Sequence, residues 1–198
     1  TKIGKESGFY ATGSYNTFVG SEAGKGGTTS VPYSSGQYNT AVGYQALDAF
    51  TTGHTNIAIG YQAMSAATTA HDSIAIGYQA LQYGGQDNNI AIGYQAGQNI
   101  TSARYNVIIG DSAGNALSAS DTNENVFIGN SAGRNADAAT NAAHYNVYVG
   151  SGAGFYMDDG DSNVYIGREA GKGSGTDNNA TKHVIIGYQA GTSISTGD

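Results

Sequence analysis

Short apolar alternations recur along the chain, and each one ends at a glycine. The residues one and three places before that glycine are aliphatic in most copies, as in Ile57 and Ile59. Alternation with a period of two predicts a β-strand whose aliphatic side chains lie on one buried face. Because only about four residues alternate before the glycine, we expect the strands to be short.

The alternation belongs to one phrase, Asn-x-x-Ile/Val-Gly-x-x-Ala, which occurs ten times with small variations. Its copies are centred on Gly20, Gly43, Gly60, Gly77, Gly93, Gly110, Gly129, Gly150, Gly167 and Gly187, and a broken copy stands at Ile3-Gly4. The phrase is clearest at Asn39, Val42, Gly43 and Ala46, at Asn56, Ile59, Gly60 and Ala63, and at Asn89, Ile92 and Gly93, and a looser copy holds Ile76 and Gly77. A repeat of this kind predicts one structural unit stacked on itself, so we expect residues 1–198 to form a single elongated array.

The spacing of the glycines indicates the size of one unit. Successive glycines lie 16 to 23 residues apart, and the longer intervals hold polar loops at residues 25–37, 115–124, 134–144 and 172–181. We therefore expect an all-β fold, a repetitive parallel β-roll or solenoid of about ten to eleven short repeats. Both ends of the chain lie within or next to repeats, which predicts a fragment of a longer fibre.

Three further positions of the phrase have structural interpretations. The glycine indicates a bend or a close backbone approach where a Cβ would not fit. The Asn before the strand either lines a ligand-binding row or forms a stacked hydrogen-bonded ladder, and the ladder is favoured because Asn bonds its own backbone at turns. An amphipathic helix through Gly-Tyr-Gln-Ala-Leu is the alternative to a strand and turn, and the fixed glycines oppose it.

Two positions vary together in a way that predicts oligomerisation. The residue two before the glycine is Ala where the residue after the glycine is Tyr, as in Ala58 and Tyr61, and it is bulky where that residue is small or polar, as in Phe127 and Asn130. A trade of volume suggests that both positions border one space. The second face of the strand would then be buried too, which in so thin a chain requires another copy, and we expect an oligomer; the resemblance given below implies that it is an intertwined or side-by-side homotrimer.

Composition narrows the classes of partner. The net charge of −7 is modest and the aliphatic pattern is regular, which opposes disorder. The eight basic residues are scattered, so a nucleic-acid partner is not expected. No apolar run is long enough to cross a bilayer, so membrane insertion is not expected either.

Catalytic and metal-binding chemistry finds little support in the sequence. No nucleophile elbow, phosphate loop or zinc motif is present, so we expect no enzyme activity and no cofactor. The densest acidic cluster holds Asp158, Asp159 and Asp161, a weak candidate for Ca²⁺ whose spacing fits no calcium loop.

The 15 tyrosines offer flat apolar faces with a hydroxyl, which suit a saccharide or protein surface. The Tyr44, Tyr61, Tyr78 and Tyr94 series is interpreted either as such a surface or as structural stacking, and the volume trade favours stacking. The residues expected to bind a receptor are therefore loop aromatics, namely Tyr33, Tyr83, Phe155 and Tyr156.

The repeated phrase resembles repeats of bacteriophage tail fibres, and it is similar to the Asn-Ser-x-Ala-Ile-Gly repeats in the heads of trimeric autotransporter adhesins. The resemblance runs from Ile3 to Ala190. It implies a homotrimer of left-handed parallel β-rolls and carries no catalytic residue. The expected function is a structural and receptor-binding segment of a phage tail fibre, located in the virion tail and partnered by a host surface glycan or outer-membrane protein.

Two other functions stay open. One is the head or stalk of a bacterial trimeric adhesin at the cell surface. The other, less favoured, is a depolymerase spike that cleaves glycans, which would need an acidic pair on a groove.

Overall fold

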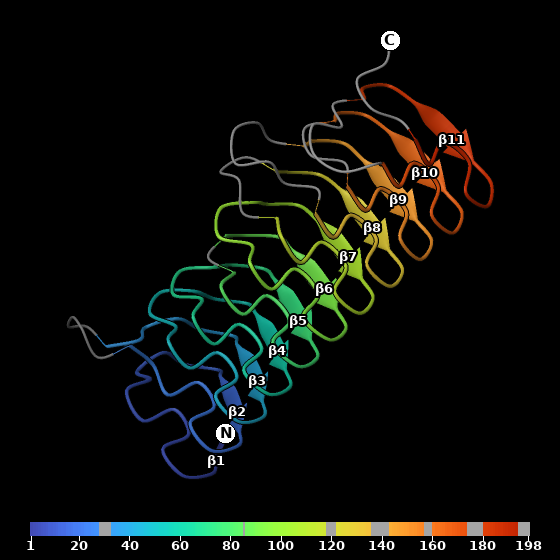
Figure 1. The fold of residues 1–198 in the computed structure, drawn as a ribbon. Helices are drawn as coiled ribbons and strands as arrows, with labels where there is room; N and C mark the ends of the chain where they lie inside the picture. Colours follow the sequence, from blue (N-terminus) through green and yellow to red (C-terminus); the bar gives the residue numbers. More distant parts are fainter. Residues whose placement is uncertain are drawn as a thin grey trace.

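The computed structural model describes residues 1–27, 33–84, 86–117, 122–135, 143–156, 160–173 and 180–193. Within them the chain forms an all-β solenoid (Figure 1) whose eleven strands make one parallel sheet in sequence order. The strands are β1 (Lys2–Ile3), β2 (Thr17–Val19), β3 (Thr40–Val42), β4 (Ile57–Ile59), β5 (Ile74–Ile76), β6 (Ile90–Ile92), β7 (Val107–Ile109), β8 (Val126–Ile128), β9 (Val147–Val149), β10 (Val164–Ile166) and β11 (Val184–Ile186).

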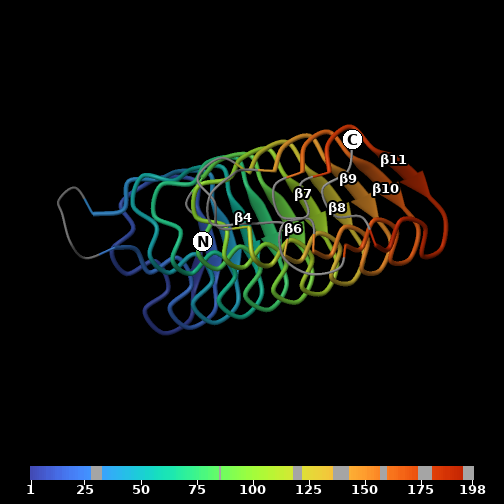
Figure 2. The ribbon, with the colours of Figure 1, turned by 45° about the horizontal axis from the view of Figure 1, so that its top comes forward.

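Each coil lies directly on the one before it. The strands pair in register, so that Ala58 of β4 faces Ala75 of β5 and Ile59 faces Ile76. The main-chain ladder continues beyond the strand into the turn, where the Gln62 N–H donates to the Tyr44 carbonyl at 2.9 Å. Equivalent residues therefore form columns along a rod, with the sheet on one side and the connecting segments on the other (Figure 2).

The middle residue of each strand points into the coil. This inner column is fully buried from Phe18 to Tyr165, whereas the aliphatic residues on either side of it are only partly covered. The expectation that the aliphatic residues lie on the buried face of the strand is therefore wrong. Period-two alternation separates the two faces of a strand without saying which of them the chain closes around. The inner column holds Phe18, Ala41, Ala58, Ala75, Ala91, Ile108, Phe127, Tyr148, Tyr165 and Ile185.

In most coils the interior is filled by a trade between the inner column and the residue four places after the glycine; Ala91 and Gly97 are the exception, and there the side chains of Ile100, Ile108 and Leu81 lie beside the glycine. Where the inner residue is Ala58, the fourth-place residue is Met64; where it is Tyr148, the fourth-place residue is Gly154. A Cβ on Gly154 would overlap the Tyr148 ring, and a Cβ on Gly133 would lie 2.8 Å from the Phe127 ring. Close packing at constant density explains this pairing.

The trade of volume seen in the sequence between the inner residue and the tyrosine does not come from contact between their side chains. Ala58 is fully buried inside the coil, while Tyr61 stands outside and is about half exposed. The two side chains lie on opposite sides of the backbone and share no space. The argument from this pair to a second chain behind the strand is therefore wrong.

The glycine that ends each strand sits where two coils touch. In Gly77 the φ angle is +137°, and a Cβ would overlap the carbonyl oxygen of Gly93 in the next coil. The expected close backbone approach is confirmed. The following Gly-Tyr-Gln-Ala segments form turns with positive φ at the glutamine, 53° at Gln62, so the helical alternative is wrong.

The Asn residues form the ladder favoured by the sequence. The Asn106 Oδ1 accepts the Asn125 N–H at 3.0 Å, and the Asn106 Nδ2 donates to the Thr122 carbonyl at 3.0 Å. The ladder runs from Asn16 to Asn163, and Ser73 takes one place in it. Each buried amide thus satisfies main-chain groups of the next coil.

Candidate functional site

The outward face of the sheet is apolar from end to end. We call it the outer aliphatic face, made by the residues one and three before each glycine. It carries no charged side chain in β2–β11, and only Thr17 and Thr40 are polar. Ile57 and Ile59 are each 37% exposed, so the face is partly covered at best in a single chain.

A tyrosine column borders this face on its turn side. The rings of Tyr44, Tyr61, Tyr78 and Tyr94 stack with centroids 5.0–5.4 Å apart, and each side chain is 42–49% exposed. The stacking favoured by the sequence is confirmed. It leaves one edge of every ring in solvent.

A glutamine column runs beside the tyrosines, formed by the residue two after each glycine. Gln62 donates to Gln45 at 2.8 Å, Gln79 to Gln62 at 3.0 Å and Gln95 to Gln79 at 3.0 Å. The column then changes to Ser112, Ser131 and Gly152, and long side chains return at Glu169 and Gln189. The short residues leave the turn surface unfilled over these coils.

A further column, six places before the glycine, holds three of the four histidines, His54, His71 and His144. His71 Nδ1 accepts the His54 N–H at 3.2 Å, and the Asp161 Oδ1 accepts the His144 N–H at 2.7 Å. These atoms hold neighbouring coils together. Asp158 and Asp159 lie outside the described residues, and among those described no group of three potential metal ligands occurs.

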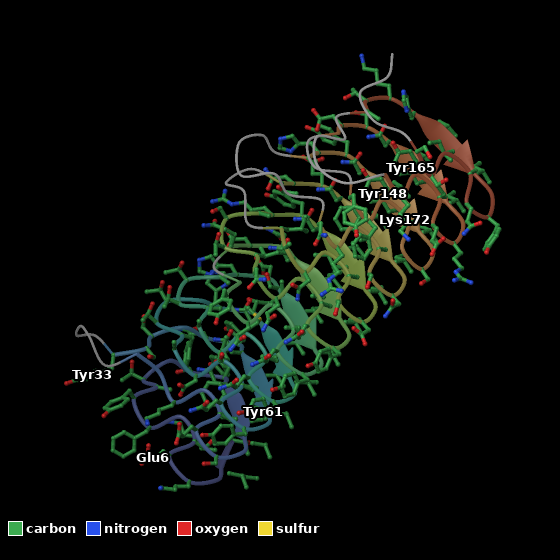
Figure 3. All side chains as sticks on the ribbon, viewed as in Figure 1. Glu6, Tyr33, Tyr61, Tyr148, Tyr165 and Lys172 are labelled. Carbon is green, nitrogen blue, oxygen red and sulfur yellow. The ribbon has the colours of Figure 1, made fainter. Side chains whose placement is uncertain are left out.

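The four aromatic residues proposed for receptor binding do not form one site. Tyr33 lies near the N-terminal end of the rod, where Figure 3 places it on the same side as Glu6. Its ring is 5.8 Å from that of Tyr10, and Tyr83 stands exposed in the middle coils. Only Phe155 and Tyr156 lie together, with ring centroids 4.5 Å apart at 66°.

Phe155 and Tyr156 line a hollow of about 200 Å³ on the turns that follow β8, β9 and β10. We call it the turn groove. Ser131 and Gly152, the short members of the glutamine column, line it where longer residues stand in other coils. The other lining residues are Asn130, Ser151, Glu169 and Lys172.

Charge around the turn groove is opposite in sign to that of the chain. Lys172 Nζ lies 3.5 Å from Glu169 Oε1, and Arg168 Nη2 lies 3.9 Å from the same oxygen. The Arg134 guanidinium lies over the Phe155 ring at 5.9 Å from its centroid. Three of the eight basic residues therefore lie in or beside the groove, and among the lining residues that the structure describes Glu169 is the single carboxylate.

Glu169 is held in its ionised form. The hydrogen bond from Gln189, 2.7 Å long, lowers the pKa of the Glu169 carboxyl, with smaller help from Lys172 and Arg168. The groove therefore presents both a carboxylate acceptor and cationic donors near neutral pH.

Two other hollows are less specific. One of about 310 Å³ lies at the start of β3 and β4, beside Tyr38 and His54, and one of about 430 Å³ lies beside Tyr105, Glu124 and Val126. Neither combines aromatic faces with more than one charged side chain in its lining.

Sequence reasoning identified the two aromatics of the turn groove and missed Gly152, Glu169 and Lys172. The signal available in the sequence was the glutamine column. Where its Gln residues are replaced by Ser131 and Gly152, a long side chain is missing from the surface of the turns. Turns after three strands must stack before these residues meet, and no local pattern shows that stacking.

No protein-family model, no curated protein and no solved structure matches this chain. The described part of the chain has no helix of the length and hydropathy needed to cross a membrane.

Proposed function

We propose that the chain is a rod-like segment of a homotrimeric fibre that attaches to a host-cell surface, of the kind found in phage tail fibres. The observation that carries this proposal is the outer aliphatic face. Contiguous apolar surface of this extent is uncommon on soluble monomers and marks a place where another chain packs.

A second copy of the same chain is the occupant that fits this face best. Each coil contributes the same two positions to this face, and another copy presents its own aliphatic residues with the same spacing from coil to coil. The absence of charge in β2–β11 on this face means that no ion would be buried on contact. Packing of copies around a common axis also favours closed symmetry, and we propose three copies because the repeat phrase resembles trimeric fibres.

Attachment rather than catalysis is the role that we assign to the rod. Its columns use Asn, Gln, Tyr and Gly to join coils, and the interior holds mostly Ala with a few larger apolar and aromatic side chains. Such a body supplies length and stiffness, and its turns can carry recognition. The adhesin-like repeat phrase makes a bacterial surface adhesin the second candidate, with the same rod and the same role.

Two measurements test this function together. Light scattering of the purified chain should give the mass of three copies, and a fluorescent form should bind cells of a susceptible host. A stable folded monomer would contradict the assembly. Steady release of reducing sugar ends from host polysaccharide would contradict the non-catalytic role.

A further inference from the structure

The turn groove combines three kinds of group that recognise sugars. Phe155 and Tyr156 offer apolar ring faces, on which the C–H face of a pyranose packs. Asn130, Ser131 and Ser151 supply amide and hydroxyl groups for hydrogen bonds to sugar hydroxyls. Binding sites of this sort use an apolar wall with a few convergent polar groups.

The groove exists because the repeat is broken there. In the coils of β3–β6 the glutamine column is continuous, and its side chains bond one another along the rod. At Gly152 the side chain is absent, and a Cβ there would meet only the Glu169 Cγ, at 3.4 Å. The vacant space thus results from a change of residue on an unchanged backbone, since φ is 67° at Gly152 and 53° at Gln62.

Local charge selects the kind of sugar. Lys172 lines the groove, Arg134 lies over its Phe155 ring and Arg168 lies beside its Glu169, which is the one carboxylate among the described lining residues, although the chain as a whole carries a net charge of −7. An excess of cations at one place on an acidic rod favours an anionic ligand. A neutral sugar would form no ion pair with these cations.

We propose that the turn groove binds an acidic saccharide, a sugar ring that bears a carboxylate or phosphate group. The ring packs against Phe155 and Tyr156, its hydroxyls bond Asn130, Ser131, Ser151 and Glu169, and its anionic group faces Lys172. This inference rests on the proposed attachment function and names the class of surface glycan that the rod recognises.

The column supplies a matched pair of variants. Gly152→Gln places in the groove the residue that the same column carries in other coils, where the backbone accepts it at a similar φ. Ser112→Gln makes the same kind of change in the coil of β7, outside the groove lining. Circular dichroism and light scattering should be the same for both variants as for the unchanged chain.

Binding is measured on an array of uronic-acid, sialic-acid and phosphorylated saccharides, each with its neutral counterpart, and inorganic phosphate is added as a competitor. At least one acidic saccharide should bind ten times or more tightly than its neutral counterpart. Gly152→Gln should lower that affinity at least tenfold, and Ser112→Gln should leave it within twofold.

The proposal fails if acidic and neutral saccharides bind equally or if no acidic saccharide binds. It also fails if both variants lose the same amount of affinity. Full displacement of the saccharide by phosphate at the saccharide's own affinity would indicate a plain anion site and would likewise overturn the proposal. Host-cell attachment is measured with the same samples. If cells bind while Gly152→Gln has no effect, the groove assignment fails and the attachment function stands.

Discussion

At the scale of single residues, the glycine that ends each strand is constrained twice, by its φ angle and by the coil above it. Gly187 separates these two constraints, because it has φ +132° in the last described coil, where the nearest atom to its Cβ position is the Ala190 Cβ at 3.7 Å. Gly77 has a similar φ and also faces the Gly93 carbonyl.

We expect Gly187→Ala to cost about 1–3 kcal/mol from backbone strain alone. Gly77→Ala should cost clearly more, because the new methyl group also displaces the next coil. Urea unfolding gives both values, and amide exchange in β11 reads the end coil. Equal losses would show that φ alone demands glycine.

The trade of volume inside the coil can also be tested at individual residues. Ala58→Phe should overpack the coil and cost about 1–3 kcal/mol, because Met64 already fills the space. Adding Met64→Gly reproduces the Phe127 and Gly133 arrangement, and it should recover most of the loss. Adding Tyr61→Ser should recover nothing, since Tyr61 lies outside. A double-mutant cycle that couples Ala58 to Tyr61 instead would contradict the packing described above.

At the scale of the element, the coil is held by ladders more than by its three-residue strands. The Asn ladder has one weak step, at Ser73, whose hydroxyl reaches the Gln86 carbonyl at 3.4 Å and receives the Asn89 N–H at 3.2 Å. Elsewhere an amide fills both roles at shorter distances, as at Asn56, whose Nδ2 donates to the Ala70 carbonyl at 2.6 Å.

Ser73→Asn should therefore stabilise the rod, by about 0.5–1.5 kcal/mol for the improved hydrogen bonds. The opposite substitution in another coil, Asn106→Ser, should destabilise the rod, because the Thr122 carbonyl and the Asn125 N–H would lose their hydrogen bonds to the Asn106 amide. Thermal unfolding monitored by circular dichroism compares the two. A loss of stability in Ser73→Asn would mean that the coil has no room for the amide there.

At the scale of the whole molecule, the proposed assembly depends on the outer aliphatic face. Ile59 lies on this face and Thr52 is exposed off it. Ile59→Asp should prevent assembly by placing a charge in the contact, and Thr52→Asp should not.

Because oligomers unfold at temperatures that depend on concentration, the melting temperature of the unchanged chain and of Thr52→Asp should rise with protein concentration. That of Ile59→Asp should be constant, with a β-type spectrum preserved. A melting temperature of the unchanged chain that is independent of concentration would refute the assembly.

The sequence by itself determined the period, the strands, the glycine contacts and the Asn ladder. Each of these depends on residues that recur in register, such as Asn56 and Gly60, and stacking in a repeat brings like residues together. Two of the four speculative binding aromatics, Phe155 and Tyr156, were also recognisable as a neighbouring pair.

Only the tertiary structure decided which face of the strand points inward. Alternation shows that two faces differ, and both Ile59 and Ala58 are apolar, so the pattern alone leaves the direction of chain closure open. The closed coil places Ala58 and Met64 inside, both fully buried, and leaves Ile59 outside at 37% exposure. The turn groove also required the structure, because its walls come from turns after β8, β9 and β10 that meet only when the coils are stacked.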